Sequence, residues 1–215
     1  MLAKYRNADP VLLGVIIAML IIGIVMTYSS SAVEGYLYYD DPYHFFKAEL
    51  IWVAMGLVAM TIALNLDLNL INRWIKPLFY ISILLLLLVK VPGIGRTVNG
   101  ATRWIGVGPL SLQPSEVVKI TTVFLMARFL ASNPYNITSF RKGIIPSLAL
   151  LALVAGLVML QPDLGTTLVI AATVFFMLFA VGAKIWHMAG LGLAGVSLIV
   201  LAIIAEPYRM RRIFA

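Results

Sequence analysis

Seven long apolar segments constrain the fold of this 215-residue chain more than any other feature. A helix needs about 20 consecutive apolar residues to cross the hydrocarbon core of a bilayer. Segments of roughly that length are predicted at residues 11–31, 48–66, 74–91, 114–131, 144–161, 165–183 and 186–205. They do not alternate apolar and polar faces as helices of soluble proteins do. The sequence therefore predicts an all-α polytopic membrane protein, with one transmembrane domain over residues 1–215.

The composition excludes several classes of site and partner. The chain is 62% hydrophobic, 12% charged and free of cysteine, which excludes disulfides and thiolate chemistry. Its net charge of +7 concerns topology and lipid headgroups, because no basic patch interleaved with aromatic residues predicts a nucleic-acid partner. His44 and His187 are predicted on opposite sides of the membrane, and no histidine and carboxylate cluster indicates a metal site. We therefore predict no cofactor and leave a divalent cation requirement open.

The orientation is predicted from the flanks of the first helix. The 16 Lys and Arg residues divide equally between the two sides, so their total does not decide it. Lys4 and Arg6 precede the first helix, whereas acidic residues follow it, which favours a cytoplasmic N-terminus. The cations of the outer side are concentrated in residues 90–119 and in the run Arg209–Arg212. Cations kept on the disfavoured side indicate an anionic ligand.

A dense polar run, Asn99–Lys119, lies between two apolar segments. Charges next to a membrane helix are costly and usually functional. Glu116 and Lys119 are three residues apart and so project from one helix face. We expect Lys119 to pair with Glu116 or with Asp163, either in a purely structural ion pair or in a binding site.

Part of the polar run is repeated later in the chain. Leu112–Glu116 and Leu160–Leu164 both begin Leu-Gln-Pro, continue with a polar residue and open an apolar helix. Proline fits the first turn of a helix, and an acidic side chain there complements the helix dipole. Both helices should start on the outer side, where their ends could face one cavity; plain capping is the alternative.

If the site is a binding site, we expect it to hold an anion such as a diphosphate. Arg103 suits phosphate by its planar guanidinium and Lys119 by its compact charge, while nearby carboxylates hold them in place. The candidate substrate-binding residues are Arg103, Lys119, Glu116, Asp163, Arg96, Arg209 and Arg212.

An ordered set of motifs identifies a family. The motifs are Tyr28-Ser-Ser-Ser31, Asn99-Gly-Ala-x-Arg-Trp-Ile, Gln113-Pro-Ser-Glu-x-x-Lys119, Gln161-Pro-Asp-Leu-Gly-Thr166 and Pro207-Tyr-Arg-Met-Arg-Arg-Ile213. Together they resemble the SEDS family (shape, elongation, division and sporulation) of FtsW, RodA and SpoVE, from residue 28 to the end. The second and last motifs are closer to the division and sporulation branch than to the elongation branch.

The resemblance implies a peptidoglycan glycosyltransferase of the bacterial inner membrane. Such an enzyme polymerises lipid II, which is linked to undecaprenyl diphosphate, into glycan strands at the outer face, beside a class B penicillin-binding protein. The resemblance carries over Arg103, Lys119, Glu116, Asp163 and the arginines after Pro207. Arg96 comes from the charge argument alone.

The chain departs from the family in length. Members have about ten helices, and their proposed catalytic aspartate lies in a large outer loop after the seventh. This sequence ends at Ala215, where that loop should begin, so we expect the catalytic base beyond it and the 215 residues alone to be inactive. Asp163 is interpreted as a partner of Lys119 rather than as the base. A lipid II flippase and a non-enzymatic division scaffold remain alternatives.

Overall fold

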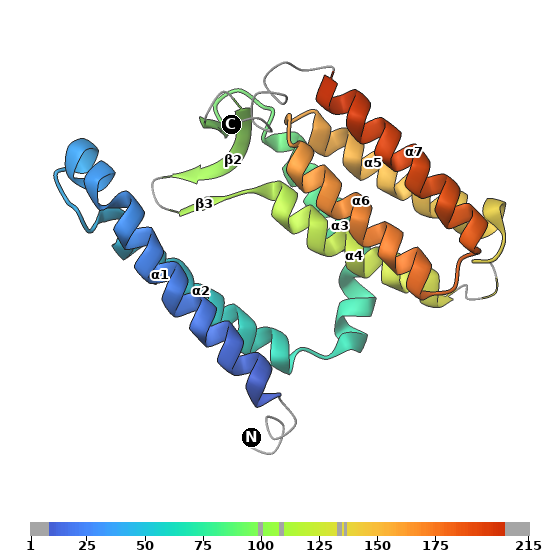
Figure 1. The fold of residues 1–215 in the computed structure, drawn as a ribbon, viewed down its shortest axis with the longest axis horizontal. Coiled ribbons are helices and arrows are strands. Elements are labelled where there is room, and N and C mark those ends of the chain that lie inside the picture. The colour runs from blue at the N-terminus through green and yellow to red at the C-terminus, as the bar shows by residue number, and fades with distance from the viewer. Residues whose placement is uncertain (1–8, 99–100, 108–109, 133–134, 136, 205–215) are drawn as a thin grey trace. The chain divides into compact units, whose positions relative to one another are not determined.

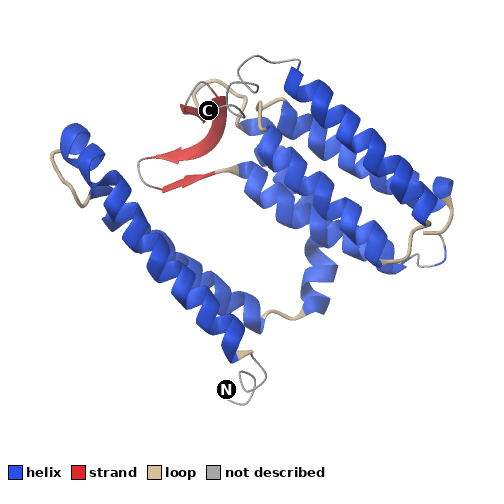
Figure 2. Cartoon of the chain, in the orientation of Figure 1, coloured by secondary structure: helices blue, strands red, loops and turns tan. Residues whose placement is uncertain are grey.

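Seven α-helices make up most of the chain in a computed structural model that describes residues 9–98, 101–107, 110–132, 135 and 137–204 (Figures 1 and 2). They are α1 (Pro10–Tyr39), α2 (His44–Asn65), α3 (Leu68–Leu88), α4 (Pro114–Ser132), α5 (Ile145–Met159), α6 (Leu164–Ala180) and α7 (Ile185–Ile204). A π-helical turn, η3 (Phe140–Ile144), leads directly into α5. The predicted helical architecture is confirmed.

Some of the helices have the length and hydropathy of membrane spans. Among the residues that the structure describes, four stretches are long and apolar enough to cross a bilayer: α1, α2, α3 and the continuous helix Phe140–Met159. Leu164–Ala180 and Ile185–Leu201 are shorter apolar helices. α4 carries Glu116, Lys119 and Arg128, and Glu116 lies in its first turn.

Two helix boundaries differ from the sequence prediction. α1 continues to Tyr39 instead of ending near residue 31, and the hydroxyls of Ser30 and Ser31 donate to the Thr27 carbonyl within the helix. α3 begins at Leu68, whereas the predicted third segment begins at residue 74. Leu66 is extended and separates α2 from α3.

The α1–α2 hairpin is one compact unit, Met1–Asp67. α1 ends where Asp40 adopts a left-handed conformation with φ 53°. Tyr39 stacks on His44 across the turn, with ring centroids 3.9 Å apart. Asp41 accepts from Lys47 Nζ at 2.7 Å.

The second unit, Leu68–Ala215, packs α3, α4, α5 and α6 around a common core. One buried cluster joins these helices through Phe79, Leu86, Val118, Val154, Val158 and Ile170. Within it, the Ser82 and Thr121 hydroxyls share a buried hydrogen bond of 2.8 Å between α3 and α4. A second cluster, which includes Ile137, Ala183 and Met188, joins the ends of α4 and α6 to the start of α7.

The segment before α4 forms a small antiparallel sheet, which the sequence analysis did not predict. Its strands are β1 (Gly95–Val98), β2 (Ala101–Val107) and β3 (Leu110–Leu112), in that order. Gly95 allows β1 to pass close to α3, since an added Cβ would lie 2.0 Å from the Val89 carbonyl oxygen. The sheet carries Arg96 and Arg103 and ends at Leu112, two residues before Pro114.

Candidate functional site

The starts of α4 and α6 lie at the same end of the second unit and are joined by a hydrogen bond, which fits the capping alternative. Gln113, just before α4, donates from Nε2 to Asp163 Oδ2 at 3.0 Å. Asp163 is the N-cap of α6: Oδ1 accepts from the Thr166 amide at 3.1 Å, and Oδ2 accepts from the Thr166 hydroxyl at 2.9 Å. One carboxylate therefore caps its own helix and links it to the neighbouring one.

The two prolines of the repeat have different places in their helices. Pro114 is the first residue of α4, as predicted, and Glu116 lies in the first turn. Pro162 lies outside α6, which begins at Leu164 after the Asp163 cap. The two similar sequences therefore form different helix starts: proline is the first residue of α4, and a carboxylate caps α6.

Arg103 reaches from β2 to the turn between α5 and α6. Its Nε donates to the Gln161 carbonyl at 2.8 Å, and its Nη2 donates to the Pro162 carbonyl. A guanidinium has five N–H donors, and these two bonds use two of them. Arg103 therefore fastens the sheet to the start of α6, a role that the sequence analysis did not foresee.

Lys119 pairs with Glu116 on α4. The Nζ to Oε2 distance is 2.6 Å, and the side chains are 28% and 51% exposed, respectively. Of the two partners expected for Lys119, Glu116 is therefore the one observed. Asp163 was interpreted as the partner of Lys119, but among the described residues its carboxylate accepts from Gln113 and Thr166 instead.

Gln113 and Gln161 make hydrogen bonds between helices that the sequence analysis did not predict. Gln161 is fully buried and donates from Nε2 to the Leu86 carbonyl at 2.9 Å, which ties the α5–α6 turn to the end of α3. The Gln161 Oε1 and Ser115 Oγ atoms are buried without a hydrogen-bond partner among the residues that the structure describes. The glutamine in each Leu-Gln-Pro repeat could have indicated these bonds, because a buried amide side chain usually has a hydrogen-bond partner.

The remaining candidate residues are Arg96, Arg209 and Arg212. Arg96 lies on β1 opposite Trp104, and the β1–β2 register shifts between Arg96 and Thr97, so that Arg103 is the extra residue of β2 at this point. Arg209 and Arg212 lie outside the described residues.

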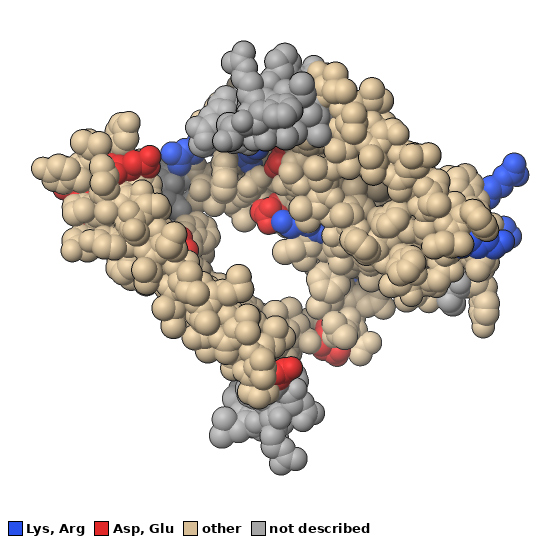
Figure 3. All heavy atoms as spheres, viewed as in Figure 1, with Lys and Arg blue, Asp and Glu red and all other residues tan. Residues whose placement is uncertain are grey.

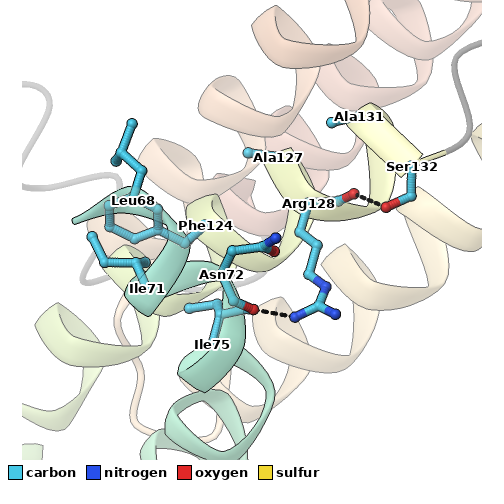
Figure 4. Close-up of a pocket in the computed structure, with 9 residues that line it drawn as sticks. All are labelled: Leu68, Ile71, Asn72, Ile75, Phe124, Ala127, Arg128, Ala131 and Ser132. Atoms are coloured by element: carbon cyan, nitrogen blue, oxygen red, sulfur yellow. Dashed lines mark hydrogen bonds between the residues drawn. The ribbon is translucent and has the colours of Figure 1, made fainter.

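A separate cavity of about 430 Å³ lies between the start of α3 and the end of α4 (Figure 4). It is lined by Leu68, Ile71, Asn72, Ile75, Phe124, Ala127, Arg128, Ala131 and Ser132. Arg128 donates to the Asn72 main-chain carbonyl and so joins the two helices at its edge. The cavity contains none of the residues predicted to bind substrate.

Comparison with known proteins assigns the chain to a family. The model of the FtsW, RodA and SpoVE family, described as a cell cycle protein, matches residues 10–215. The chain belongs to the FtsW, RodA and SpoVE family. It is a multi-pass membrane protein of bacterial type, and the resemblance found in its motifs is confirmed.

Curated relatives agree with the family assignment. The chain is 40% identical to the stage V sporulation protein E of Bacillus subtilis (strain 168), over 99% of this chain and 58% of that protein. It is 37% identical to a probable peptidoglycan glycosyltransferase FtsW of Trichlorobacter lovleyi, over 100% of this chain and 55% of that protein. The chain thus spans little more than half the length of these relatives.

Solved structures share the fold. A chain from a peptidoglycan synthase complex that coordinates polymerization and crosslinking aligns with a TM-score of 0.66 and 29% identity, over 89% of this chain and 57% of that one. The rod shape determining protein RodA of Thermus thermophilus aligns with a TM-score of 0.63 and 30% identity, over 85% and 57%. These similarities confirm the helical membrane fold.

Proposed function

We propose that these residues belong to a peptidoglycan glycosyltransferase that polymerises lipid II at the outer face of the bacterial inner membrane, in division or sporulation. The observation that carries this proposal is the family match over residues 10–215, with relatives named as probable peptidoglycan glycosyltransferases. The orientation that goes with it is a cytoplasmic N-terminus, which puts the Arg103 and Asp163 side of the molecule outside.

The chemistry requires two kinds of group. The acceptor hydroxyl must lose a proton to a base as it forms a bond to the anomeric carbon, and the bond from that carbon to the lipid diphosphate must break. Negative charge then grows on the departing diphosphate, where fixed cations stabilise it. Arg103 and Lys119 are suited to this second task, and Arg96, Arg209 and Arg212 are further candidates for it.

The geometry makes the two main cations unequal. Lys119 is partly exposed and held by a single carboxylate, so a diphosphate can compete for it. Arg103 already holds two main-chain carbonyls and is better suited to fixing the position of the site. Glu116 and Asp163 then act by placing Lys119 and α6, not as bases.

We also propose that the 215 residues do not polymerise lipid II by themselves. Our candidates for substrate binding lie within them, whereas the family resemblance puts the base in a later outer loop. The functional partner would be a class B penicillin-binding protein that crosslinks the glycan product; a solved structure from a peptidoglycan synthase complex is similar to this chain.

The test is polymerisation of lipid II by the full-length natural protein with its cognate transpeptidase, with and without divalent cation. The proposal predicts glycan polymer, lost with Arg103→Ala or Lys119→Ala while the variants stay folded and bound to the partner. Translocation of lipid II in liposomes without polymer would favour a flippase instead. Partner binding with neither activity would leave a division scaffold.

A further inference from the structure

Three cations gather at the end of the second unit that lies away from Arg103 and Asp163. Arg141 and Lys142 are in η3, and Lys184 directly precedes α7; we call these three residues the basic patch. The Phe140 and His187 rings, 5.2 Å apart, bring η3 against the start of α7. All three cations are exposed, and Figure 3 shows Lys and Arg atoms gathered at the η3 end of this unit.

The basic patch lacks acidic neighbours. Residues 117–162 and 164–205 contain no Asp or Glu, so η3, α5, the α6–α7 turn and α7 supply no carboxylate. Within the described part of the chain, Arg141, Lys142 and Lys184 make no ion pair. Because exposed like charges repel one another when no counter-charge is near, this end has an unbalanced positive potential.

The positions of these cations in their helices increase that potential. A helix start carries partial positive charge, so a cation there is unfavourable and an anion is favourable. Neither α5 nor α7 has an acidic residue in its first turn, whereas α4 has Glu116 and α6 has the Asp163 cap. The cations therefore destabilise their own helix starts unless an anion from outside neutralises them.

The apolar surroundings favour a lipid as the source of that anion. Trp186 is 84% exposed next to Lys184, and Ile185 is 63% exposed. On the η3 side, Phe140 and Ile145 are 45% and 46% exposed. Tryptophan and apolar side chains next to cations are typical of the membrane interface, where the rings lie at headgroup depth and the cations meet lipid phosphates.

We propose that the basic patch binds the headgroup of an anionic phospholipid in the leaflet facing the η3 end of the protein. Arg141, Lys142 and Lys184 contact the phosphate and its anionic headgroup, and Trp186 and Ile185 lie against the upper acyl chains. This site is distinct from the proposed glycosyltransferase site and needs neither lipid II nor a partner protein.

The test is titration of the purified chain, in a neutral detergent, with phosphatidylglycerol or phosphatidylcholine, with bound lipid counted by native mass spectrometry. Three proteins are compared: the natural sequence, Arg141→Gln/Lys142→Gln/Lys184→Gln, and Arg73→Gln/Lys76→Gln/Lys90→Gln. The second triple variant removes the same charge from exposed positions elsewhere, so it measures general attraction of the anionic lipid to a basic protein.

We expect phosphatidylglycerol binding to weaken at least about tenfold in the patch variant and less than about threefold in the control variant. Arg141→Lys/Lys184→Arg, which keeps the charges, should bind as the natural chain does. Equal binding by the natural chain and the patch variant would overturn the proposal, as would equal binding of both lipids. Displacement of the lipid by millimolar inorganic phosphate would show a free-anion site instead.

Discussion

The helix starts at the two ends of the α4–α7 bundle carry side chains of opposite charge. At one end, α4 and α6 begin with Glu116 and Asp163, and Asp163 also accepts from Gln113 on the neighbouring helix. At the other end, the helices begin beside Arg141, Lys142 and Lys184. At the first end, the carboxylates of the protein itself balance the positive helix starts. At the second end, the cations add to that positive charge, and an external anion would balance it.

The comparison shows how to separate structural from functional charges. A charged residue that accepts several hydrogen bonds within the protein, such as Asp163, is explained by the fold. A charge in an electrostatically unfavourable position without a partner in the described chain requires a ligand or a surface. Lys119 lies between these cases, because its carboxylate partner leaves it 28% exposed.

The largest effect is expected for Asp163→Ala. The change removes the α6 cap and leaves the Gln113 amide without its acceptor, so unfolding should become easier by about 2 to 3 kcal/mol. Thermal and detergent-induced unfolding of the purified chain measure this loss. Asp163→Asn keeps an oxygen acceptor and should lose about half as much. An Asp163→Ala variant as stable as the natural chain would remove the contrast between the two ends.

The opposite sign is expected for the charge reversal Arg141→Glu/Lys142→Glu. In neutral detergent, two carboxylates at the η3 start should stabilise the protein by about 1 kcal/mol, because they complement the helix dipole. Added phosphatidylglycerol should raise the unfolding temperature of the natural chain but not that of the reversed variant. Destabilisation by the reversal in neutral detergent would show that the cations are already balanced internally.

A smaller effect is expected for Glu116→Gln. The Lys119–Glu116 pair is partly exposed, so its loss should lower the free energy of unfolding by about 0.5 kcal/mol at low salt. The difference should shrink toward zero near 1 M salt, since exposed pairs are screened. Unfolding measured at both salt concentrations checks this, and a salt-independent loss above about 2 kcal/mol would instead indicate a buried structural pair.

The smallest effect concerns Asp41, an exposed carboxylate before α2. Its hydrogen bond from Lys47, with the Tyr43 amide, lowers the pKa of Asp41 below the ordinary value of 3.8. The stabilisation is therefore present above pH 3.8 and is lost as the pH falls through the lowered pKa. A carboxyl NMR titration should show this pKa returning toward the ordinary value in Lys47→Ala. An unchanged pKa would contradict the assigned cause.

Much of the fold follows from local patterns. Pro114 marks the first residue of α4, and the apolar segments give the helices because a bilayer leaves few other solutions. The sheet was missed although Asn99-Gly100 separates two β-prone stretches, a sequence typical of hairpins. The extension of α1 was missed because the polar run Ser29–Ser31 interrupts the apolar segment, although its hydroxyls bond within the helix.

For the candidate site, the sequence predicted the places of the residues better than their hydrogen-bond partners. The spacing of Glu116 and Lys119 places both on one helix face, but it left Asp163 open as the other partner of Lys119. Gln113, which bonds Asp163, and Gln161, which bonds Arg103, lie 50 and 58 residues away in sequence, and only the packing of the helices decides these bonds. Long-range hydrogen bonds of this kind are the part that local patterns do not contain.

The most direct test of the account is the initial rate of lipid II polymerisation by the full-length natural protein carrying Lys119→Ala. Lys47→Ala is the matched control, because it removes an exposed lysine whose carboxylate partner, Asp41, lies in the α1–α2 turn. We predict that Lys119→Ala lowers the rate at least about 100-fold, as expected for loss of a charge that stabilises the departing diphosphate. Lys47→Ala should keep the natural rate. Equal rates for both variants and the natural protein would contradict a substrate-binding role for this end of the molecule.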